Sequence, residues 1–185
     1  MRDLIVTENI TVDGVIDSAG GWFTPAEGTV DQSDINEALR EQMAAADAFL
    51  VGRVTFEDMR GYWPARTDDT TGVAAYLDSV SKYVVSRTLG EPGWRHTTVL
   101  RGNVRDVVRE LKAEPGGDIV TTGSVTLVRE LVAAGLVDEY RLFVYPVVLG
   151  QGRRLFADAS GVPGLRLVES RPFTSGVVLL RYRTA

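Results

Sequence analysis

The chain has 185 residues, of which 44% are hydrophobic and 24% are charged. This length and balance are typical of a soluble globular protein, and we expect a single domain over residues 1–185 with one sizeable core. The formal net charge of −5 argues against broad binding to nucleic acid or to anionic membranes. An anionic ligand would therefore have to be held by local basic groups.

Cysteine is absent and histidine occurs once. These counts exclude disulfides, thiolate chemistry and metal sites built from cysteine or from several histidines, and no metal site is predicted. The apolar run that follows Met1, Arg2 and Asp3 is one strand long, so no signal peptide is expected. No run approaches the length of a membrane span, and we expect a cytoplasmic protein.

Short apolar and β-branched runs predict strands along the whole chain. They are expected at residues 4–11, 48–51, 82–85, 97–100, 119–120, 139–145, 165–173 and 177–182. Segments with apolar residues at helical spacing lie between them, at residues 31–46, from 54 onward, 104–112 and 124–134. Asn103 is expected to cap the third of these helices, and Gly135 to end the fourth.

Strands that alternate with helices predict one α/β domain with a mostly parallel sheet and helices on both of its faces. Residues 174–176 form a turn-like connection between the last two strands, so a C-terminal antiparallel hairpin is expected at the edge of the sheet. No internal repeat or linker is visible. In such sheets, ligands bind at the carboxyl ends of the parallel strands.

The stretch 119–131 is the most informative of these strand ends. An apolar strand stops at Thr122, Gly123 and Ser124, and a helix follows at once. The unpaired N–H groups at the start of that helix, with the positive end of its dipole, suit an anion such as a nucleotide phosphate. Ser124 can instead simply cap the helix.

Two other strand ends carry related groups. The segment 52–55 again follows a strand and opens a helix, and Ser86 and Arg87 follow a third strand. Arg53 and Arg87 can each form a charged fork on a phosphate, or can pair with surface acids. Together the three strand ends predict a dinucleotide site.

Common nucleotide and hydrolase motifs are missing. No Gly-x-Gly-x-x-Gly follows the first strand, and no Gly-Lys-Ser/Thr phosphate loop or Gly-x-Ser-x-Gly elbow occurs. Residues 150–154 resemble half of a dinucleotide fingerprint but open no clear helix, and His96 is expected to be a solvated loop residue. Hydride transfer fits the sequence because it needs only a positioned cofactor and one proton source.

Several acids and aromatic residues can border such a site. Asp13 or the acids near the start of the first predicted helix, Asp31, Asp34 and Glu37, can supply a proton. The Asp13-Gly14 pair can equally be a simple turn.

The aromatic side chains have two interpretations as well. Trp22 can form a wall of the site or pack its own loop. For Phe56 and Trp63, core packing is the favoured interpretation.

Residues 51–57, followed by Tyr62 and Trp63, resemble the Gly-Arg-x-Thr-aromatic-Glu segment of the dihydrofolate reductase superfamily. Residues 122–125 lie where those enzymes have a glycine-rich turn on the cofactor pyrophosphate. A more specific resemblance is carried by residues 11–16, 135–140, 145–152 and 155–156. These segments are similar to the reductase domain of bifunctional riboflavin-biosynthesis deaminase/reductases and their stand-alone relatives.

The resemblance implies a reductase that uses NADPH. The residues implied along the adenosine phosphates are Gly52, Arg53, Val54 and Thr55. Those implied on the pyrophosphate are Thr122, Gly123, Ser124, Val125 and Thr126. Ser86 and Arg87 would face the 2′-phosphate and adenine, and Ile16 would lie near the nicotinamide. The residues implied on the substrate side are Trp22 and Phe56, with Asp13 and Asp34 as candidate catalytic acids.

The implied substrate is a small pyrimidine- or pterin-like heterocycle, with 5-amino-6-(5-phosphoribosylamino)uracil of riboflavin biosynthesis as one candidate. Two alternatives remain open. True dihydrofolate reductase would require one helix acid facing the pteridine, and a non-catalytic module would keep only the nucleotide site. Relatives of the riboflavin type pair through the sheet edge and the late strands, which implies a homodimer.

Overall fold

The chain alternates between strands and helices over most of its length. The computed structural model describes residues 1–17, 20–23, 30–157 and 162–185. Its strands are β1 (Leu4–Thr11), β2 (Ala46–Gly52), β3 (Ser81–Val85), β4 (Thr97–Leu100), β5 (Asp118–Thr121), β6 (Glu139–Tyr145), β7 (Leu165–Pro172) and β8 (Val178–Thr184). Its helices are α1 (Ser33–Ala45), α2 (Arg53–Tyr62), the 3₁₀ turn η1 (Trp63–Ala65), α3 (Val73–Ser79), α4 (Val104–Ala113) and α5 (Val125–Ala133).

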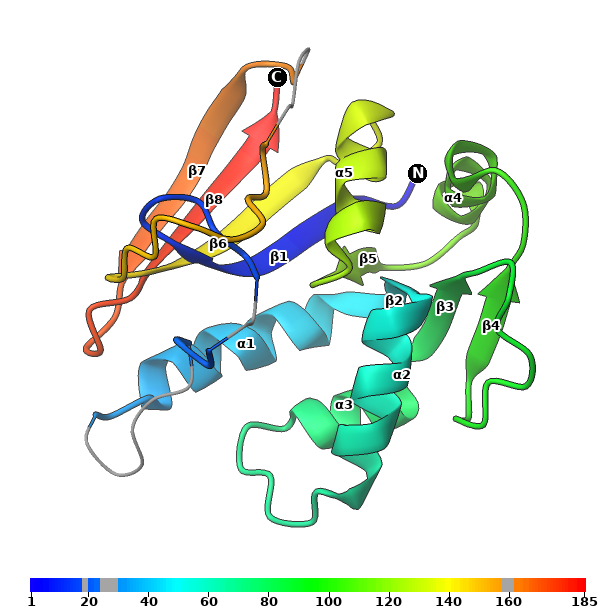
Figure 1. Cartoon of the computed structure of the whole chain (residues 1–185), viewed down its shortest axis with the longest axis horizontal. Helices are drawn as coiled ribbons and strands as arrows, with labels where there is room; N and C mark the ends of the chain where they lie inside the picture. Colours follow the sequence, from blue (N-terminus) through cyan, green and yellow to red (C-terminus); the bar gives the residue numbers. More distant parts are fainter. Residues whose placement is uncertain (18–19, 24–29, 158–161) are drawn as a thin grey trace.

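The strands within the described residues form one eight-stranded sheet with the order β4-β3-β2-β5-β1-β6-β8-β7. Figure 1 shows how these strands and the helices are arranged. The neighbours from β4 to β6 are parallel. Strand β8 is antiparallel to β6, and β7 is antiparallel to β8. The predicted α/β fold, with a mostly parallel sheet and a C-terminal antiparallel hairpin, is confirmed.

The predicted element boundaries hold closely, with two kinds of exception. The first helix begins at Ser33 rather than at residue 31, and it ends at Ala45 because Ala46 already belongs to β2. Helix α3 and the turn η1 were not predicted. A seven-residue helix with a single fully buried side chain, Leu77, is too short to show a helical period in the sequence.

Side chains of successive strand residues alternate between the two faces of the sheet. On one face, Leu4 and Val6 of β1 join Leu50 of β2 in a core covered by α4 and α5. On the other face, Ile5 and Phe49 pack with residues of α2 and α3. The central strands are thus buried on both sides, which explains their nearly continuous apolar sequences.

Helix α1 covers the second face farther along the sheet. Ile35 and Ala38 of α1 pack there against Phe143 of β6 and Leu179 of β8. None of the helices within the described ranges is long and apolar enough to cross a bilayer.

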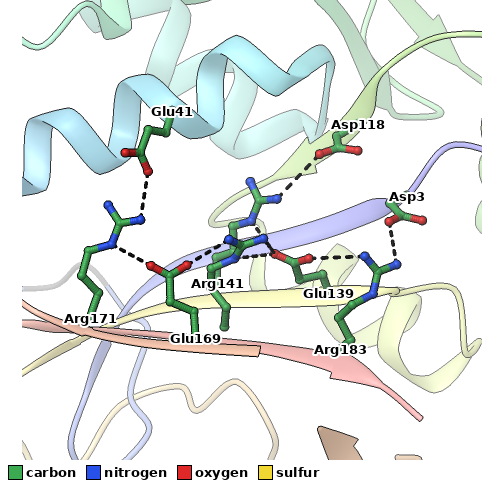
Figure 2. A network of polar contacts seen from close by, with 9 residues as sticks. Asp3, Glu41, Asp118, Glu139, Arg141, Glu169, Arg171 and Arg183 are labelled. Carbon is green, nitrogen blue, oxygen red and sulfur yellow. Dashed lines mark hydrogen bonds and ion pairs between the residues drawn. The ribbon is translucent and has the colours of Figure 1, made fainter. Parts of the chain in front are cut away.

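A network of charged side chains lies on strands β6, β8 and β7, beside α1 (Figure 2). Glu139 is 2% exposed and accepts hydrogen bonds from Arg141 at 2.6 Å and Arg181 at 2.9 Å. Arg181 also donates to Glu169 at 2.9 Å. The register of neighbouring strands brings these side chains together. Arg181 of β8 lies opposite Arg141 of β6 on one side and opposite Glu169 of β7 on the other.

The network reaches two further elements. Arg171 of β7 joins Glu169 to Glu41 of α1, and Arg183 of β8 joins Glu139 to Asp3 near the start of β1. Burial by itself raises the pKa of Glu139, but the hydrogen bonds from Arg181 and Arg141 outweigh it and hold the pKa below its ordinary value. Glu139 is therefore an ionised carboxylate inside the fold.

Replacement of Glu139 by glutamine should lower the free energy of unfolding by about 3 kcal/mol. The buried Arg141 would lose its hydrogen-bonded carboxylate and keep only Asp118, at 3.6 Å, as a counter-charge. Since its folded pKa is lowered, ionised Glu139 stabilises the fold above its ordinary pKa, and this contribution is lost as the pH falls through the lowered value. Urea unfolding at neutral and acid pH measures both effects. The matched control is Glu169→Gln. The Glu169 side chain is 25% exposed, so this substitution should lower the free energy of unfolding by less than about 1 kcal/mol. Equal effects of the two substitutions would contradict the assignment.

Candidate functional site

A cleft of about 630 Å³ opens at the carboxyl ends of β2, β5 and β1. The connections between parallel strands run toward opposite sides of the sheet from this point. The connection through α1 leads from β1 across β5 to β2, whereas the connection through α5 leads from β5 across β1 to β6. Ligands of open α/β sheets bind at such a switch point.

Most of the predicted cofactor residues line this cleft. They are Ile16, Gly52, Arg53, Val54, Thr55, Thr122, Gly123, Ser124, Val125 and Thr126, together with the predicted substrate residue Trp22. Two of the three predicted strand ends, at residues 52–55 and 122–124, thus meet there with the loop after β1. Ser86, Arg87, Phe56, Asp13 and Asp34 are not among the residues that line it.

Two hydrogen bonds join the start of α2 to the start of α5. The Ser124 N–H donates to Thr55 Oγ1 at 2.9 Å, and the Gly52 N–H donates to Ser124 Oγ at 2.8 Å. Ser124 makes no side-chain bond to its own helix, so the alternative that it simply caps α5 is wrong. We call these two bonds the Thr55–Ser124 clasp.

The clasp leaves the first turns of both helices open to a ligand. Neither α2 nor α5 has a side-chain cap, and the first N–H groups of a helix have no partner within it. Val54 and Thr55 of α2 face the same cleft as Val125 and Thr126 of α5. Two positive helix ends therefore meet at one place, which favours an anion there.

The turn before α5 has an uncommon backbone. Gly123 has a φ of +58° and Ser124 a φ of +49°, so two successive residues are left-handed. A Cβ at Gly123 would lie 3.3 Å from Thr55 Cγ2. Serine at positive φ is strained, and the clasp holds it in that conformation.

Two arginines bring positive charge to the cleft, and both are exposed ion-pair partners. Arg53 donates to Glu57 at 2.6 Å one helical turn away, and Arg153 donates to Asp17 at 3.1 Å. Exposed pairs of this kind are weak. Either guanidinium can therefore turn to a phosphate without a large loss of stability.

Ser86 and Arg87 lie at the same edge of the sheet, one strand farther along. Val85, at the end of β3, is the register partner of Gly52, at the end of β2. Arg87 therefore lies two residues past the end of β3, beside the strand that leads into α2. The Ser86 hydroxyl accepts N–H bonds from Thr88 and Leu89, which gives it a local structural use. The Arg87 side chain is exposed.

Asp13 is held outside the cleft by a dense set of hydrogen bonds. Its carboxylate accepts from the Thr11 hydroxyl at 2.6 Å and from the N–H groups of Gly150 and Leu149. The hydrogen bond from Thr11 is the main reason that its pKa falls to about 2. An acid with this pKa stays ionised near neutral pH, which suits a group that fixes the loop rather than a proton donor.

The acids at the start of α1 have similar uses. Asp34 accepts from the Thr174 N–H at 2.8 Å, and this bond is the main reason that its pKa is lowered. Asp31 accepts from the Ser33 N–H, and Glu37 is exposed. None of these three lines the cleft. Asp34 therefore ties α1 to the turn between β7 and β8.

The two aromatic residues predicted on the substrate side differ in their surroundings. Trp22 lines the cleft, donates its indole N–H to the Asp17 carbonyl at 2.8 Å and packs edge-on against Tyr145. Phe56 is 1% exposed and packs against Trp94, with a ring-centroid separation of 5.9 Å. The structure thus agrees with core packing for Phe56.

A second, smaller cavity of about 250 Å³, which we call the inner cavity, adjoins the cleft. Five residues line both spaces: Glu8, Asn9, Met59, Trp63 and Thr122. The inner cavity is otherwise mostly apolar, with Gln42 and Tyr76 as its other large polar side chains.

Sequence reasoning missed Glu8, Gln42 and Tyr76. The signal for Glu8 is present in the first strand, where an acid and Asn9 interrupt an otherwise apolar and β-branched run. Acids are depleted in strands and almost never fully buried without a partner. For Gln42 and Tyr76 no signal exists in the sequence, because only the packing of α1 and α3 brings them to one cavity.

Residues 2–179 of the chain match the family of RibD C-terminal domains. The chain belongs to the RibD C-terminal domain family. The resemblance to riboflavin-type reductase domains, within the dihydrofolate reductase-like superfamily, is therefore confirmed.

Relatives and solved structures agree with this assignment. The uncharacterized protein YyaP of Bacillus subtilis is 33% identical over 186 residues, which is 98% of this chain and 94% of YyaP. A protein of Shewanella sp. PV-4, described as a riboflavin biosynthesis protein, shares the fold with a TM-score of 0.74 at 21% identity, over 100% of this chain and 99% of its own.

The bifunctional diaminohydroxyphosphoribosylaminopyrimidine deaminase/5-amino-6-(5-phosphoribosylamino)uracil reductase of Thermotoga maritima also shares the fold. Its TM-score is 0.68 at 18% identity, and the match covers 100% of this chain and 57% of the bifunctional one.

Replacement of Gly123 by alanine should lower the free energy of unfolding by about 2 kcal/mol, because the added methyl group combines a positive φ with contact on Thr55. The matched control is Gly135→Ala. Gly135 has a φ of +64°, but a Cβ added there would meet nothing within 4 Å, so that variant should lose only about 1 kcal/mol. Urea unfolding of both variants isolates the packing of the clasp, and equal losses would contradict it.

Proposed function

We propose that the protein is an NADPH-dependent reductase that transfers a hydride to a small heterocyclic substrate, a pyrimidine- or pterin-like ring. The observation that carries this proposal is the convergence of two uncapped helix starts, those of α2 and α5, on one cleft at the switch point of the sheet. Membership of the RibD C-terminal domain family supports it.

The cleft suits the phosphates of a dinucleotide. The turn 122–126 and the segment 52–55 would hold the pyrophosphate and the adenosine phosphate through backbone N–H groups, and Arg53 would add a charged fork. Arg87, on the neighbouring strand end, would reach the 2′-phosphate that distinguishes NADPH from NADH. When bound, the cofactor supplies the hydride, and the protein orients it and excludes water.

The inner cavity suits the ring of the substrate. It lies beside the cleft, and its walls include Phe49, Leu77 and Phe143, which can cover the faces of a flat heterocycle. Ile16 and Trp22 stand in the cleft itself, where the nicotinamide would meet the ring. The uracil substrate named for the Thermotoga maritima enzyme is one member of this chemical class.

True dihydrofolate reduction is less well supported. It would need an acid of α1 facing the pteridine, yet Asp31, Asp34 and Glu37 lie outside both the cleft and the inner cavity. We therefore propose a heterocycle other than dihydrofolate.

Titration with NADPH and NADH, followed by nicotinamide fluorescence, tests the nucleotide site. Arg53→Ala should weaken both nucleotides, whereas Arg87→Ala should weaken NADPH selectively, each by about tenfold to a hundredfold. Arg109→Ala is the matched control, because Arg109 is an exposed arginine of α4 outside the cleft. Failure of the wild-type protein to bind either nucleotide would refute the reductase proposal.

We also propose a homodimer that forms through the late strands. Strand β7 is at the edge of the sheet, and its side chains Leu165, Leu167 and Val168 are 37%, 51% and 42% exposed. A long edge strand with exposed apolar side chains favours pairing with another chain.

Leu167→Glu should therefore convert the dimer to a monomer, as measured by light scattering after gel filtration. Ala133→Glu, at an exposed position of α5, should leave the dimer intact. A wild-type protein that is monomeric at high concentration would contradict the homodimer.

A further inference from the structure

Three side chains that line the inner cavity each carry a buried polar atom without a partner. Glu8 Oε1, Gln42 Nε2 and the Tyr76 hydroxyl make no hydrogen bond within the described residues, and all three side chains line this cavity. They come from three elements, β1, α1 and α3. Unpaired buried polar groups are rare in native proteins and are expensive to leave unsatisfied. Their convergence on one cavity indicates a ligand that satisfies them together.

Glu8 is the most constrained of the three. Its side chain is 4% exposed, and Oε2 accepts the Gly123 N–H at 3.1 Å. Burial raises the pKa of Glu8 well above its ordinary value, and the bond from Gly123 offsets only part of that effect. Burial therefore favours the protonated form of this carboxyl group, and its Oε1 makes no hydrogen bond within the described residues.

Among the described residues that line the cleft and the inner cavity, no cation stabilises the ionised form of Glu8. Their titratable groups are Asp17, Arg53, Asp58, Arg153 and Tyr76. Arg53 pairs with Glu57 and Arg153 with Asp17, Asp58 is exposed, and burial raises the pKa of Tyr76. Both arginines are thus paired with carboxylates other than Glu8, and no cation offsets the effect of burial on Glu8.

We propose that protonated Glu8 recognises the substrate ring in the inner cavity and donates the proton of the reduction, an inference that rests on the proposed function. Asp13 and Asp34 do not compete for this role, because both are ionised and neither lines the cleft or the inner cavity.

The three unpartnered atoms define the chemistry of the ligand. The Glu8 hydroxyl, the Gln42 amide nitrogen and the Tyr76 hydroxyl can all donate. The ligand therefore presents acceptors to these groups, namely carbonyl oxygens or imine-type ring nitrogens. An oxidised heterocycle with a C=N bond next to a carbonyl group has this pattern.

The proton step balances for such a ring. As the carbon of the C=N bond accepts a hydride from the reduced nicotinamide, the π pair moves to nitrogen and takes the proton from Glu8 Oε1. A C–H and an N–H bond form, and the C=N double bond becomes single. Glu8 is left as a carboxylate that keeps its hydrogen bond from Gly123, and water of the cleft returns the proton.

Binding of 1,3-dimethyllumazine tests the recognition without any cofactor. This fluorescent pteridinedione carries acceptors only and has no ionisable N–H. Wild-type protein should bind it at neutral pH, and affinity should fall by about tenfold per pH unit once Glu8 ionises. Glu8→Gln keeps a neutral donor and should bind with no pH dependence. Glu8→Leu should bind about tenfold more weakly at neutral pH. Glu110→Gln, at an exposed position of α4 outside both spaces, should behave as wild type.

An infrared difference spectrum between wild type and Glu8→Gln provides a second readout. A protonated carboxyl C=O band should be present at neutral pH and should vanish at high pH. Loss of the pH dependence in Glu8→Gln, together with this band, supports the proposal. Equal binding by wild type and Glu8→Leu, no probe binding by a folded wild type, or no protonated carboxyl band would each overturn it.

These measurements are independent of the nucleotide titration. If NADPH fails to bind while the probe binds through Glu8, the reductase proposal fails and the inner cavity remains a ring-binding site. If NADPH binds but the probe ignores Glu8, only the role of Glu8 fails.

Discussion

The Thr55–Ser124 clasp is the constraint on which the site depends. Two helices that start side by side bring the positive ends of their dipoles together, which is unfavourable in the absence of an anion. The two hydrogen bonds of the clasp hold these ends in place. The unfavourable interaction between the two helix ends would be relieved by a bound phosphate. Ser124, in the turn before α5, also adopts strained dihedral angles.

Two buried glutamates show how partners decide the charge of a carboxyl group. Glu139 and Glu8 are 2% and 4% exposed, yet their pKa values shift in opposite directions. Glu139 has arginines from β6 and β8 around it, so its charge is stabilised (Figure 2). Glu8 has a single backbone N–H, so its neutral form is favoured. The neighbouring residues produce this difference, because Arg141 of the same strand and Arg181 of β8 bind Glu139, whereas no arginine binds Glu8 within the described residues.

Much of the fold follows from the sequence because its signals are local. The strands at 4–11, 97–100 and 139–145 and the cap at Asn103 depend on residues close in the chain. The position of the cleft follows from strand ends that are also visible locally. The clasp does not, because Ser124 carries the residue type of a helix cap while its hydroxyl binds Gly52, which lies 72 positions away.

Strands β1 and β2 are consecutive in the sequence but are separated in the sheet by β5. The cleft therefore cannot exist until residues 118–121 have been inserted between them, and Glu8 meets Gly123 across 115 positions. During synthesis, β1 and β2 are made long before β5. Their apolar faces and unpaired backbone edges therefore stay exposed until β5 is made. Long-range closure of this kind is slow and exposes the chain to mispairing. The same insertion that creates the ligand site is thus also the step at which assembly of this fold is most vulnerable.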